Sequence, residues 1–391
     1  MTDAVEPGDA AAANPMAGDP MAALVAALPT QLVDTRRRLA GWTLPLAPGR
    51  PAIQAVVVCG MGGSAIAADI VAGALSDRAV LPITVVRSAH LPGWVGPDTL
   101  VVASSHSGRT RETRLAWQAA RRAGARVVVV TAGEDFAAEA RDAGAAVIAI
   151  PPGGPPRAAL GHGIAAMLTV LEAAGAVPPG CDVGAAAAAQ TVLDGAFGDA
   201  LSPSALADAL VERVPLLYAA DALAPVARRW KGQLNENAKA LAVTDTLPEM
   251  FHNTVVGFGH PSWLAERATA VFLGALDVAL AGGEVGVQVI RSGSSDRAEA
   301  AARAEDVDRS DAHEHLGTAG MRTLLEDRGI ASVRVVAPHP HGLAAALWLV
   351  SYGDVLSLAL AARYTEAPTP IAAIDELKRR VGAAREGPRA G

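Results

Sequence analysis

Glycines and a hydroxyl gather behind the first strongly apolar run of this chain. Residues 55–59 read AVVVC, and a turn with Gly62, Gly63 and Ser64 follows before a segment typical of a helix. The apolar run fits a strand buried on both faces. The glycines allow a sharp turn, and Ser64 with the unpaired N–H groups of the helix would face an anion such as phosphate. A P-loop is excluded because no GK[ST] follows. Alone, this turn fits a purely structural role equally well.

A second cluster of hydroxyls follows the apolar run 100–103. Residues 104–113 read SSHSGRTRET and include Ser105, Ser107 and Thr110. In an open α/β sheet, ligands bind beyond the carboxyl ends of the strands. Hydroxyls and helix N–H groups there can satisfy the oxygens of a phosphate monoester without lysine or metal. Helix capping is the alternative, but capping does not need this many hydroxyls. Two such turns on one sheet favour a phosphate site.

Charged side chains in three further motifs could supply acid–base chemistry. Glu236 lies in GQLNENAK (232–239), where flanking asparagines oppose helical propensity. His252 lies in EMFHN, and a carboxylate with an imidazole near one sugar phosphate gives acid–base catalysis near neutral pH. Arg157 could pair with a phosphate or a developing oxyanion. From the residues alone, each also fits a surface or packing role, as does Lys378 in IDELK near the C-terminus.

The histidines and cysteines form no metal-binding pattern. Neither HExxH nor paired Cys/His spacing occurs, although four histidines form two loop-like pairs, His313 with His315 and His339 with His341. The two cysteines are far apart in the sequence and support neither a disulfide framework nor a zinc site. A nicotinamide-dependent dehydrogenase is disfavoured, because segment 83–88 ends in Arg87 and Ser88 rather than an acidic residue.

Composition narrows the class of protein. The chain has 391 residues, which suggests two domains, and 51% are hydrophobic but only 4% aromatic, which suits helices packed on parallel sheets. A net charge of −7 disfavours nucleic acid as a partner. Residues 1–19 have no signal-peptide pattern and read as a disordered tail. Charges interrupt the apolar stretch 263–281, so we expect no membrane span and a cytoplasmic protein.

Strand and helix patterns alternate along the chain, which predicts an α/β fold with doubly wound parallel sheets sandwiched by helices. A helix is expected over 20–42, with a break or kink at Pro29. Strands are expected at 55–59, 83–87, 99–103, 126–131, 146–150, 270–275, 285–290 and 332–337. Helices are expected between the early strands and at 158–176, 221–240, 262–272, 341–362 and 370–382. We predict an N-terminal domain over 20–195, a C-terminal domain over 205–391 and a mobile charged insertion at 291–314.

Taken together and in order, these motifs resemble the bifunctional phosphoglucose/phosphomannose isomerase family. The resemblance spans about residues 20–382 and rests on the segments GMGGSAI (60–66), SHSGRTRET (105–113), GQLNENAK (232–239), EMFHN (249–253) and IDELK (374–378). It implies two flavodoxin-like sugar isomerase (SIS) domains and a homodimer with active sites at the interface. It also implies a hexose 6-phosphate substrate and no metal or other cofactor.

The resemblance also implies a role for each motif residue. Glu236 would be the base that moves a proton between C1 and C2. His252, donated by the partner subunit, would assist ring opening with Lys378, and Arg157 would stabilise the enediolate. Thr369, in the segment PTP, is linked in the family to accepting both the glucose and the mannose epimer. The sugar phosphate would be bound by Gly62, Gly63, Ser64, Ser105, Ser107 and Thr110.

Two positions depart from the family pattern, which usually has Tyr and Asn where this chain has His106 and Arg109. Arg109 places a cation beside the expected phosphate site. Two alternatives stay open at this point. One is a SIS isomerase acting on another phosphosugar, and the other is a non-catalytic SIS regulator that senses a phosphosugar. Retention of a base, a histidine and a lysine disfavours the regulator, because sensing needs no base.

Overall fold

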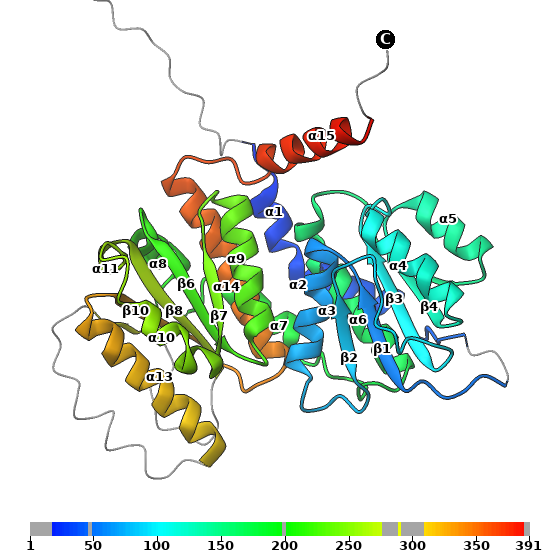
Figure 1. Cartoon of the computed structure of the whole chain (residues 1–391), viewed down its shortest axis with the longest axis horizontal. Coiled ribbons are helices and arrows are strands. Elements are labelled where there is room, and N and C mark those ends of the chain that lie inside the picture. Colours follow the sequence, from blue (N-terminus) through cyan, green and yellow to red (C-terminus); the bar gives the residue numbers. More distant parts are fainter. Residues whose placement is uncertain (1–17, 46–48, 198–200, 276–287, 291–308, 387–391) are drawn as a thin grey trace, which may run out of the picture.

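The computed structural model describes residues 18–45, 49–197, 201–275, 288–290 and 309–386. Within these ranges, two sheets stand side by side and helices cover each of them (Figure 1). The expected α/β fold of two sandwiched sheets is therefore confirmed. The predicted tail falls outside the described residues up to residue 17, as does the predicted insertion from 291 to 308.

The first sheet has the strand order β2-β1-β3-β4-β5, and every pair in it is parallel. This order is the flavodoxin-like one, whose switch point lies between the first and third strands. The strands are β1 (Ala55–Cys59), β2 (Ile83–Val86), β3 (Thr99–Ser105), β4 (Arg126–Thr131) and β5 (Ala146–Ala149). The apolar runs became strands because alternate residues pack against helices on both faces.

Helices cover both faces of the first sheet. One face packs on α3 (Gly62–Ala74) and α6 (Leu160–Ala173), and the other on α4 (Arg111–Arg122) and α5 (Glu134–Asp142). The short helix η1 (Pro156–Ala158) leads into α6. The helix expected over 20–42, with its break or kink at Pro29, forms as two helices, α1 (Met21–Ala26) and α2 (Leu28–Arg38), which meet at Ala27. Pro29 sits in the first turn of α2, where a missing N–H costs nothing.

The second sheet has the order β7-β6-β8-β10-β9, which is parallel except at the β9 edge. Its strands are β6 (Val214–Ala220), β7 (Val243–Leu247), β8 (Ala268–Ala275), β9 (Gln288–Ile290) and β10 (Ala331–Ala337). One face packs on α9 (Ala224–Asn237) and α14 (Leu343–Arg363). The other packs on α13 (Arg309–Asp327), η2 (Glu249–His252) and α10 (Thr254–Gly257), with α11 (Leu264–Arg267) just before β8.

Two expectations for this half were wrong. The predicted helix 262–272 forms only as the short α11, because β8 begins at Ala268 and its apolar residues are buried in the sheet. Strand β7 was not predicted, since its sequence VTDTL is polar and it lies at a sheet edge, where an apolar pattern is not required. Residues 309–314 of the predicted insertion belong to α13.

Helices join the two halves through a continuous apolar core. Helices α7 (Ala185–Leu193) and α8 (Pro203–Leu210) lie between the two sheets in the sequence, and both pack on α14. A single core cluster includes Val56 of the first sheet and Leu217 of the second. The exact division into domains stays a prediction.

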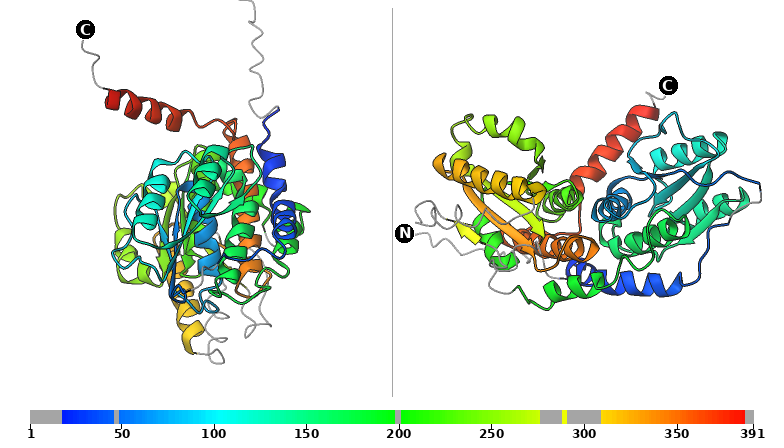
Figure 2. Two further views of the ribbon diagram at one scale, coloured as in Figure 1. Left: turned by 90° about the vertical axis from the view of Figure 1, so that its right-hand side faces the viewer. Right: turned by 90° about the horizontal axis from the view of Figure 1, so that it is seen from below.

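Helix α14 is apolar along its whole length. By length and composition it could cross a membrane, but 78% of its most apolar window is buried inside the fold. It is therefore a core helix of this structure, and the cytoplasmic location stays a prediction. The last helix, α15 (Ala372–Glu386), instead projects away from both sheets (Figure 2).

Candidate active site

The two hydroxyl-bearing turns meet at one edge of the first sheet. Strands β1 and β3 are neighbours in parallel register, so the turns after Cys59 and Ser105 emerge side by side. The backbone N–H of His106 donates to the Ser64 hydroxyl at 3.1 Å, which ties the turns together. The structure thus brings together the two segments predicted to bind phosphate.

The hydroxyls in these turns keep protons available for an acceptor. Ser64 accepts from a backbone N–H, and Ser107 accepts from the Arg109 N–H at 3.2 Å. Ser105 donates to Thr110 at 3.0 Å, which leaves the Thr110 proton uncommitted among the contacts of the described residues. The Ser64, Ser107 and Thr110 oxygens therefore act as acceptors inside the protein, and their O–H groups can point outward to an anion, whereas the Ser105 proton is engaged by Thr110.

The helices that begin at this edge have open first turns. Within the described chain no side chain caps α3, and Thr110, which precedes α4, makes no capping hydrogen bond. The capping alternative for the hydroxyls therefore has no support in the geometry. Free N–H groups at two helix starts, together with the helix dipoles, favour a bound phosphate.

Gly62 and Gly63 of the first turn are each required for a different structural reason. Gly62 has φ +51°, a left-handed conformation that favours glycine. A side chain on Gly63 would place its Cβ 2.6 Å from the Pro156 carbonyl oxygen. The absence of that side chain lets η1 lie directly against the start of α3. Arg157, the next residue of η1, is consequently held beside the turns predicted to bind phosphate.

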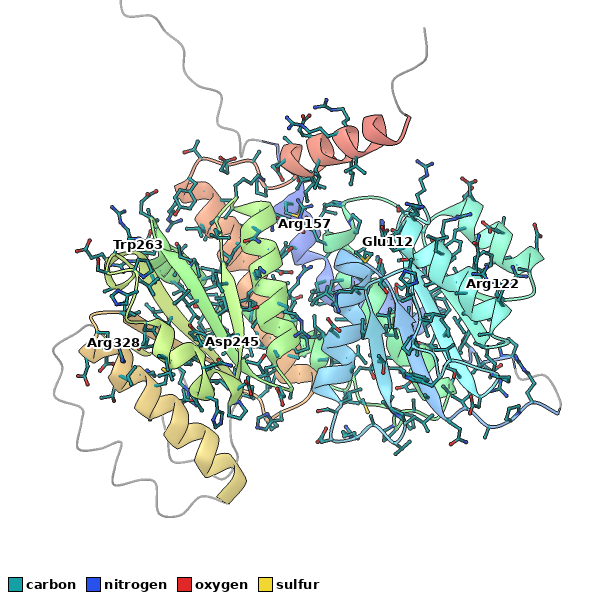
Figure 3. All side chains as sticks on the ribbon, in the orientation of Figure 1. Glu112, Arg122, Arg157, Asp245, Trp263 and Arg328 are labelled. Atoms are coloured by element: carbon teal, nitrogen blue, oxygen red, sulfur yellow. The ribbon has the colours of Figure 1, made fainter. Side chains whose placement is uncertain are left out.

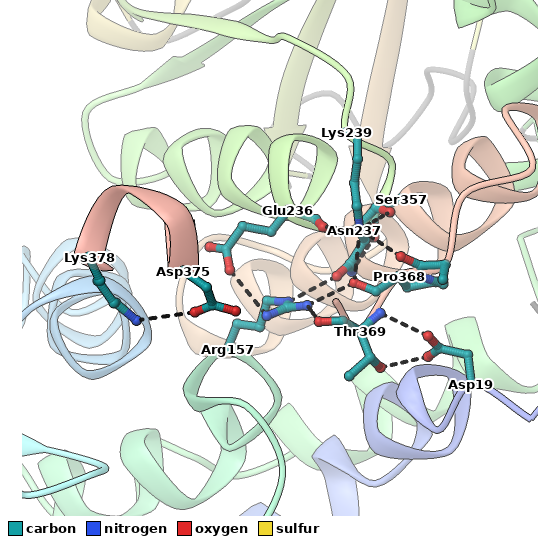
Figure 4. A network of polar contacts seen from close by, with 11 residues as sticks. Asp19, Arg157, Glu236, Asn237, Lys239, Ser357, Pro368, Thr369, Asp375 and Lys378 are labelled. Atoms are coloured by element: carbon teal, nitrogen blue, oxygen red, sulfur yellow. Dashed lines mark hydrogen bonds and ion pairs between the residues drawn. The ribbon is translucent and has the colours of Figure 1, made fainter. Parts of the chain in front are cut away.

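Arg157 is the centre of a buried polar network between the two halves (Figure 4). Its guanidinium is only 4% exposed. Nε donates to Asn237 Oδ1 at 3.0 Å, and Nη2 donates to the carbonyl oxygens of Pro368 at 2.9 Å and Thr369 at 3.1 Å. Nη1 lies 3.2 Å from Glu236 Oε2. Burial lowers the pKa of Arg157 and the Glu236 carboxylate opposes that shift, so the side chain stays a cation.

Glu236 and its flanking asparagines lie at the end of α9. The Glu236 side chain is 34% exposed, so one carboxylate is both paired with Arg157 and open to a ligand. Asn237 is fully buried and donates to Ser357 at 3.0 Å while it accepts from Arg157. Asn235 accepts the Ala242 N–H at 3.1 Å. The asparagines that oppose helical propensity thus end the helix and orient the arginine.

Lys239 links the end of α9 to the segment that precedes Thr369. Its Nζ donates to the carbonyl oxygens of Glu236 at 2.8 Å and Ala367 at 2.6 Å, which ties the end of α9 to the segment before Thr369. Burial lowers the pKa of this ammonium group. The Lys239 ammonium group therefore holds the backbone at Glu236 and Ala367 in place. We assign no proton transfer to it and keep Glu236 and Arg157 as the candidate reacting groups.

Two predicted site residues make no direct contact with the Arg157 network. His252 ends η2, which follows β7, and the loop is tied to Asp245 through the Thr254 hydroxyl. Figure 3 shows Asp245 well below Arg157 on the second half of the molecule. Lys378, on α15, is 71% exposed and its ammonium lies 3.9 Å from Asp375, in the same close view as Arg157 and Glu236 (Figure 4). Among the described residues, neither His252 nor Lys378 has a hydrogen bond or ion pair with Arg157 or Glu236.

The Thr369 hydroxyl is engaged by a residue that sequence analysis missed. It donates to Asp19 Oδ1 at 2.7 Å, although residue 19 had been assigned to the tail. The only sequence signal for Asp19 was the pair Asp19-Pro20 directly before α1. Asp-Pro pairs occur in many turns, so this pair does not indicate a functional residue. Within the described residues, no group of three or more His, Cys, Asp or Glu side chains is placed to hold a metal ion.

Curated relatives align with most of this chain. A bifunctional phosphoglucose/phosphomannose isomerase of Caldicellulosiruptor bescii is 29% identical over 343 residues, which cover 84% of this chain and 90% of the relative. The protein of the same name from Aquifex aeolicus is 27% identical over 83% of this chain and 89% of its own length. Residues 202–381 match the model of the bacterial phospho-glucose isomerase C-terminal SIS domain. Over most of its length the chain is thus similar to bifunctional phosphoglucose/phosphomannose isomerases.

Solved structures agree with this family in fold. A hypothetical protein of Thermus thermophilus superposes with a TM-score of 0.68 at 18% identity, covering 95% of this chain and 92% of its own. Tagatose-6-phosphate ketose/aldose isomerase of Escherichia coli has a TM-score of 0.60 at 14% identity, covering 94% and 98%. At these identities the likeness concerns the fold alone.

The two departures from the phosphoglucose/phosphomannose isomerase pattern lie at the phosphate turns. Arg109 is exposed beside Ser107. His106 is half-buried, and within the described structure its Nε2 has no hydrogen-bond partner. Burial lowers the pKa of His106, so a neutral imidazole lies next to Ser64 at neutral pH.

Proposed function

We propose that this protein interconverts glucose 6-phosphate and mannose 6-phosphate with fructose 6-phosphate. The observation that carries the proposal is the pairing of a partly exposed carboxylate, Glu236, with a buried guanidinium, Arg157, beside two turns rich in hydroxyl and N–H donors. The turns suit the phosphoryl group, and the pair suits proton transfer on an α-hydroxy aldehyde.

Glu236 would take the hydrogen from C2 of the open-chain aldose as a proton. The electron pair of that C–H bond forms the C1–C2 double bond, and the charge moves to O1. A proton passes from O2 to O1, and Glu236 returns its proton to C1 to give the ketose. Glucose and mannose 6-phosphate differ only at C2, so both give the same enediol once that hydrogen is removed. Arg157 would stabilise the enediolate oxygens through charge.

One site residue, His252, would come from a second copy of the chain and assist ring opening with Lys378. His252 is exposed, and among the described residues it has no hydrogen bond or ion pair with Arg157 or Glu236. Helix α15, which carries Lys378, projects from the body of the molecule (Figure 2). A homodimer in which the partner supplies His252 for ring opening would complete the site.

A second candidate is turnover of a related phosphosugar. A D-glucosamine-6-phosphate 4-epimerase of Sulfolobus acidocaldarius is 28% identical over 213 residues, covering 53% of this chain and 65% of its own. The same hydroxyl turns would hold the phosphate of an amino sugar equally well. The substrate panel below therefore includes glucosamine 6-phosphate.

The test is a coupled assay of fructose 6-phosphate formation from glucose and mannose 6-phosphates, with NMR detection of any product from glucosamine 6-phosphate and thermal-shift measurements on all three sugars. We expect turnover of both, with activity unchanged by EDTA. Stabilisation by the sugars without turnover would instead identify a phosphosugar sensor. Turnover of glucosamine 6-phosphate alone would favour the second candidate.

A further inference from the structure

The Asp19 carboxylate holds a turn that is distant in sequence. Its Oδ1 accepts from the Thr369 hydroxyl at 2.7 Å, and its Oδ2 accepts from the Thr369 N–H at 2.9 Å, across 350 residues of chain. Oδ1 also accepts the Met21 N–H at 2.9 Å, at the start of α1. Both oxygens are therefore satisfied, and the carboxylate fixes both the backbone and the side chain of Thr369 (Figure 4).

The turn held by Asp19 faces Arg157. The Pro368 and Thr369 carbonyl oxygens both accept from Arg157 Nη2, at 2.9 and 3.1 Å. Lys239 holds the preceding residue, Ala367, through its carbonyl oxygen at 2.6 Å. Asp19 and Lys239 thus hold the segment that carries the Pro368 and Thr369 carbonyl oxygens. These two oxygens in turn hold Nη2 of the Arg157 guanidinium.

The opposite edge of that guanidinium faces Glu236, since Nη1 is the nitrogen that lies 3.2 Å from Oε2. A guanidinium is planar, so fixing Nη2 and Nε also sets the direction of Nη1. Burial alone would raise the pKa of Asp19, but the hydrogen bonds from Thr369 and Met21 outweigh it and keep the pKa below its usual value. The carboxylate is therefore charged at neutral pH.

We propose that Asp19 is a positioning residue for the isomerisation, acting through the Thr369 turn to orient the Arg157 guanidinium toward Glu236 and the enediolate oxygens. The inference rests on the proposed function for its catalytic consequence. It assigns Thr369 a role through its carbonyl oxygen, because the hydroxyl proton is already committed to Asp19.

The kinetic test compares D19N, T369V and T369S with wild type. Misplacing a catalytic group by about 1 Å can cost about 100-fold, so we expect D19N and T369V to lower kcat by about 10- to 100-fold. KM should stay within about threefold, because the phosphate turns are untouched. T369S keeps a hydroxyl for Asp19 and should recover most of the activity that T369V loses. D34N, at a carboxylate that is 55% exposed and paired with Arg37, is the matched control.

A spectroscopic readout separates this inference from the proposed activity. In ¹⁵N-arginine-labelled protein, the Arg157 Nη resonances, assigned with R157K, should be resolved because hydrogen bonds hinder rotation. In D19N and T369V they should merge, while T369S keeps them resolved. Unchanged resonances in both D19N and T369V would overturn the inference, whether or not the wild type turns over hexose phosphates. Wild-type kcat in both variants would overturn its catalytic part.

Discussion

Replacing Glu236 with glutamine tests the proposed base with little change in shape. The amide can still accept from Arg157 Nη1, which lies 3.2 Å from Oε2, but it cannot carry the proton between carbons. General-base catalysis contributes about 10²- to 10⁴-fold, so kcat should fall by that factor. This equals about 2.7 to 5.4 kcal/mol of transition-state stabilisation. KM should hardly move, because the hydroxyl turns still hold the phosphate.

The same substitution should have a small effect on stability. Breaking a fully buried ion pair costs about 3–5 kcal/mol, whereas exposed pairs contribute about 1 kcal/mol or less. Glu236 is 34% exposed, and Arg157 keeps its bonds to Asn237, Pro368 and Thr369. We therefore expect a loss of about 1 kcal/mol, seen as a Tm decrease of a few degrees at most.

The assay combines initial rates with hydrogen exchange. In D₂O, the wild-type enzyme should form fructose 6-phosphate with deuterium from solvent at C1, because the proton on the Glu236 carboxyl exchanges during the reaction, and E236Q should not. E266Q changes an exposed glutamate on the other half of the molecule and serves as control. An E236Q enzyme with kcat within about threefold of wild type would refute the assignment.

Three further predictions concern the phosphate turn, the partner subunit and pH. S64A removes one hydrogen bond to a charged phosphate, worth about 1.5–3 kcal/mol, so KM should rise by about 10- to 100-fold with kcat little changed in saturating assays. Mixing E236Q with H252Q subunits should restore activity to mixed dimers if the histidine is donated in trans; no recovery would place it in its own site. Burial, chiefly, lowers the pKa of His162 from 6.5 to about 4, so the unfolded chain binds its proton first as pH falls. Stability should thus decline from pH 6.5 to about 4 and level off below, by up to about 3 kcal/mol, and urea midpoints of H162Q should lack that decline.

Much of the fold followed from local pattern. The apolar runs 55–59 and 126–131 became β1 and β4 with the predicted bounds, because strands buried on both faces need continuous apolar residues. The two phosphate turns were predictable for a related reason: adjacent parallel strands place their carboxyl ends together whatever else the chain does. Strand β7 was not predicted, because a strand at the edge of a sheet does not need a continuous run of apolar residues.

The sequence by itself therefore determined the alternation of strands and helices, the hydroxyl turns and the presence of a candidate base. Only the tertiary structure decided which groups surround that base. Arg157 contacts Asn237 across 80 residues and Pro368 across 211, and Asp19 reaches Thr369 across 350. Such contacts leave no periodic trace in the sequence, because each depends on how the two halves pack and on where buried donors and acceptors must be satisfied.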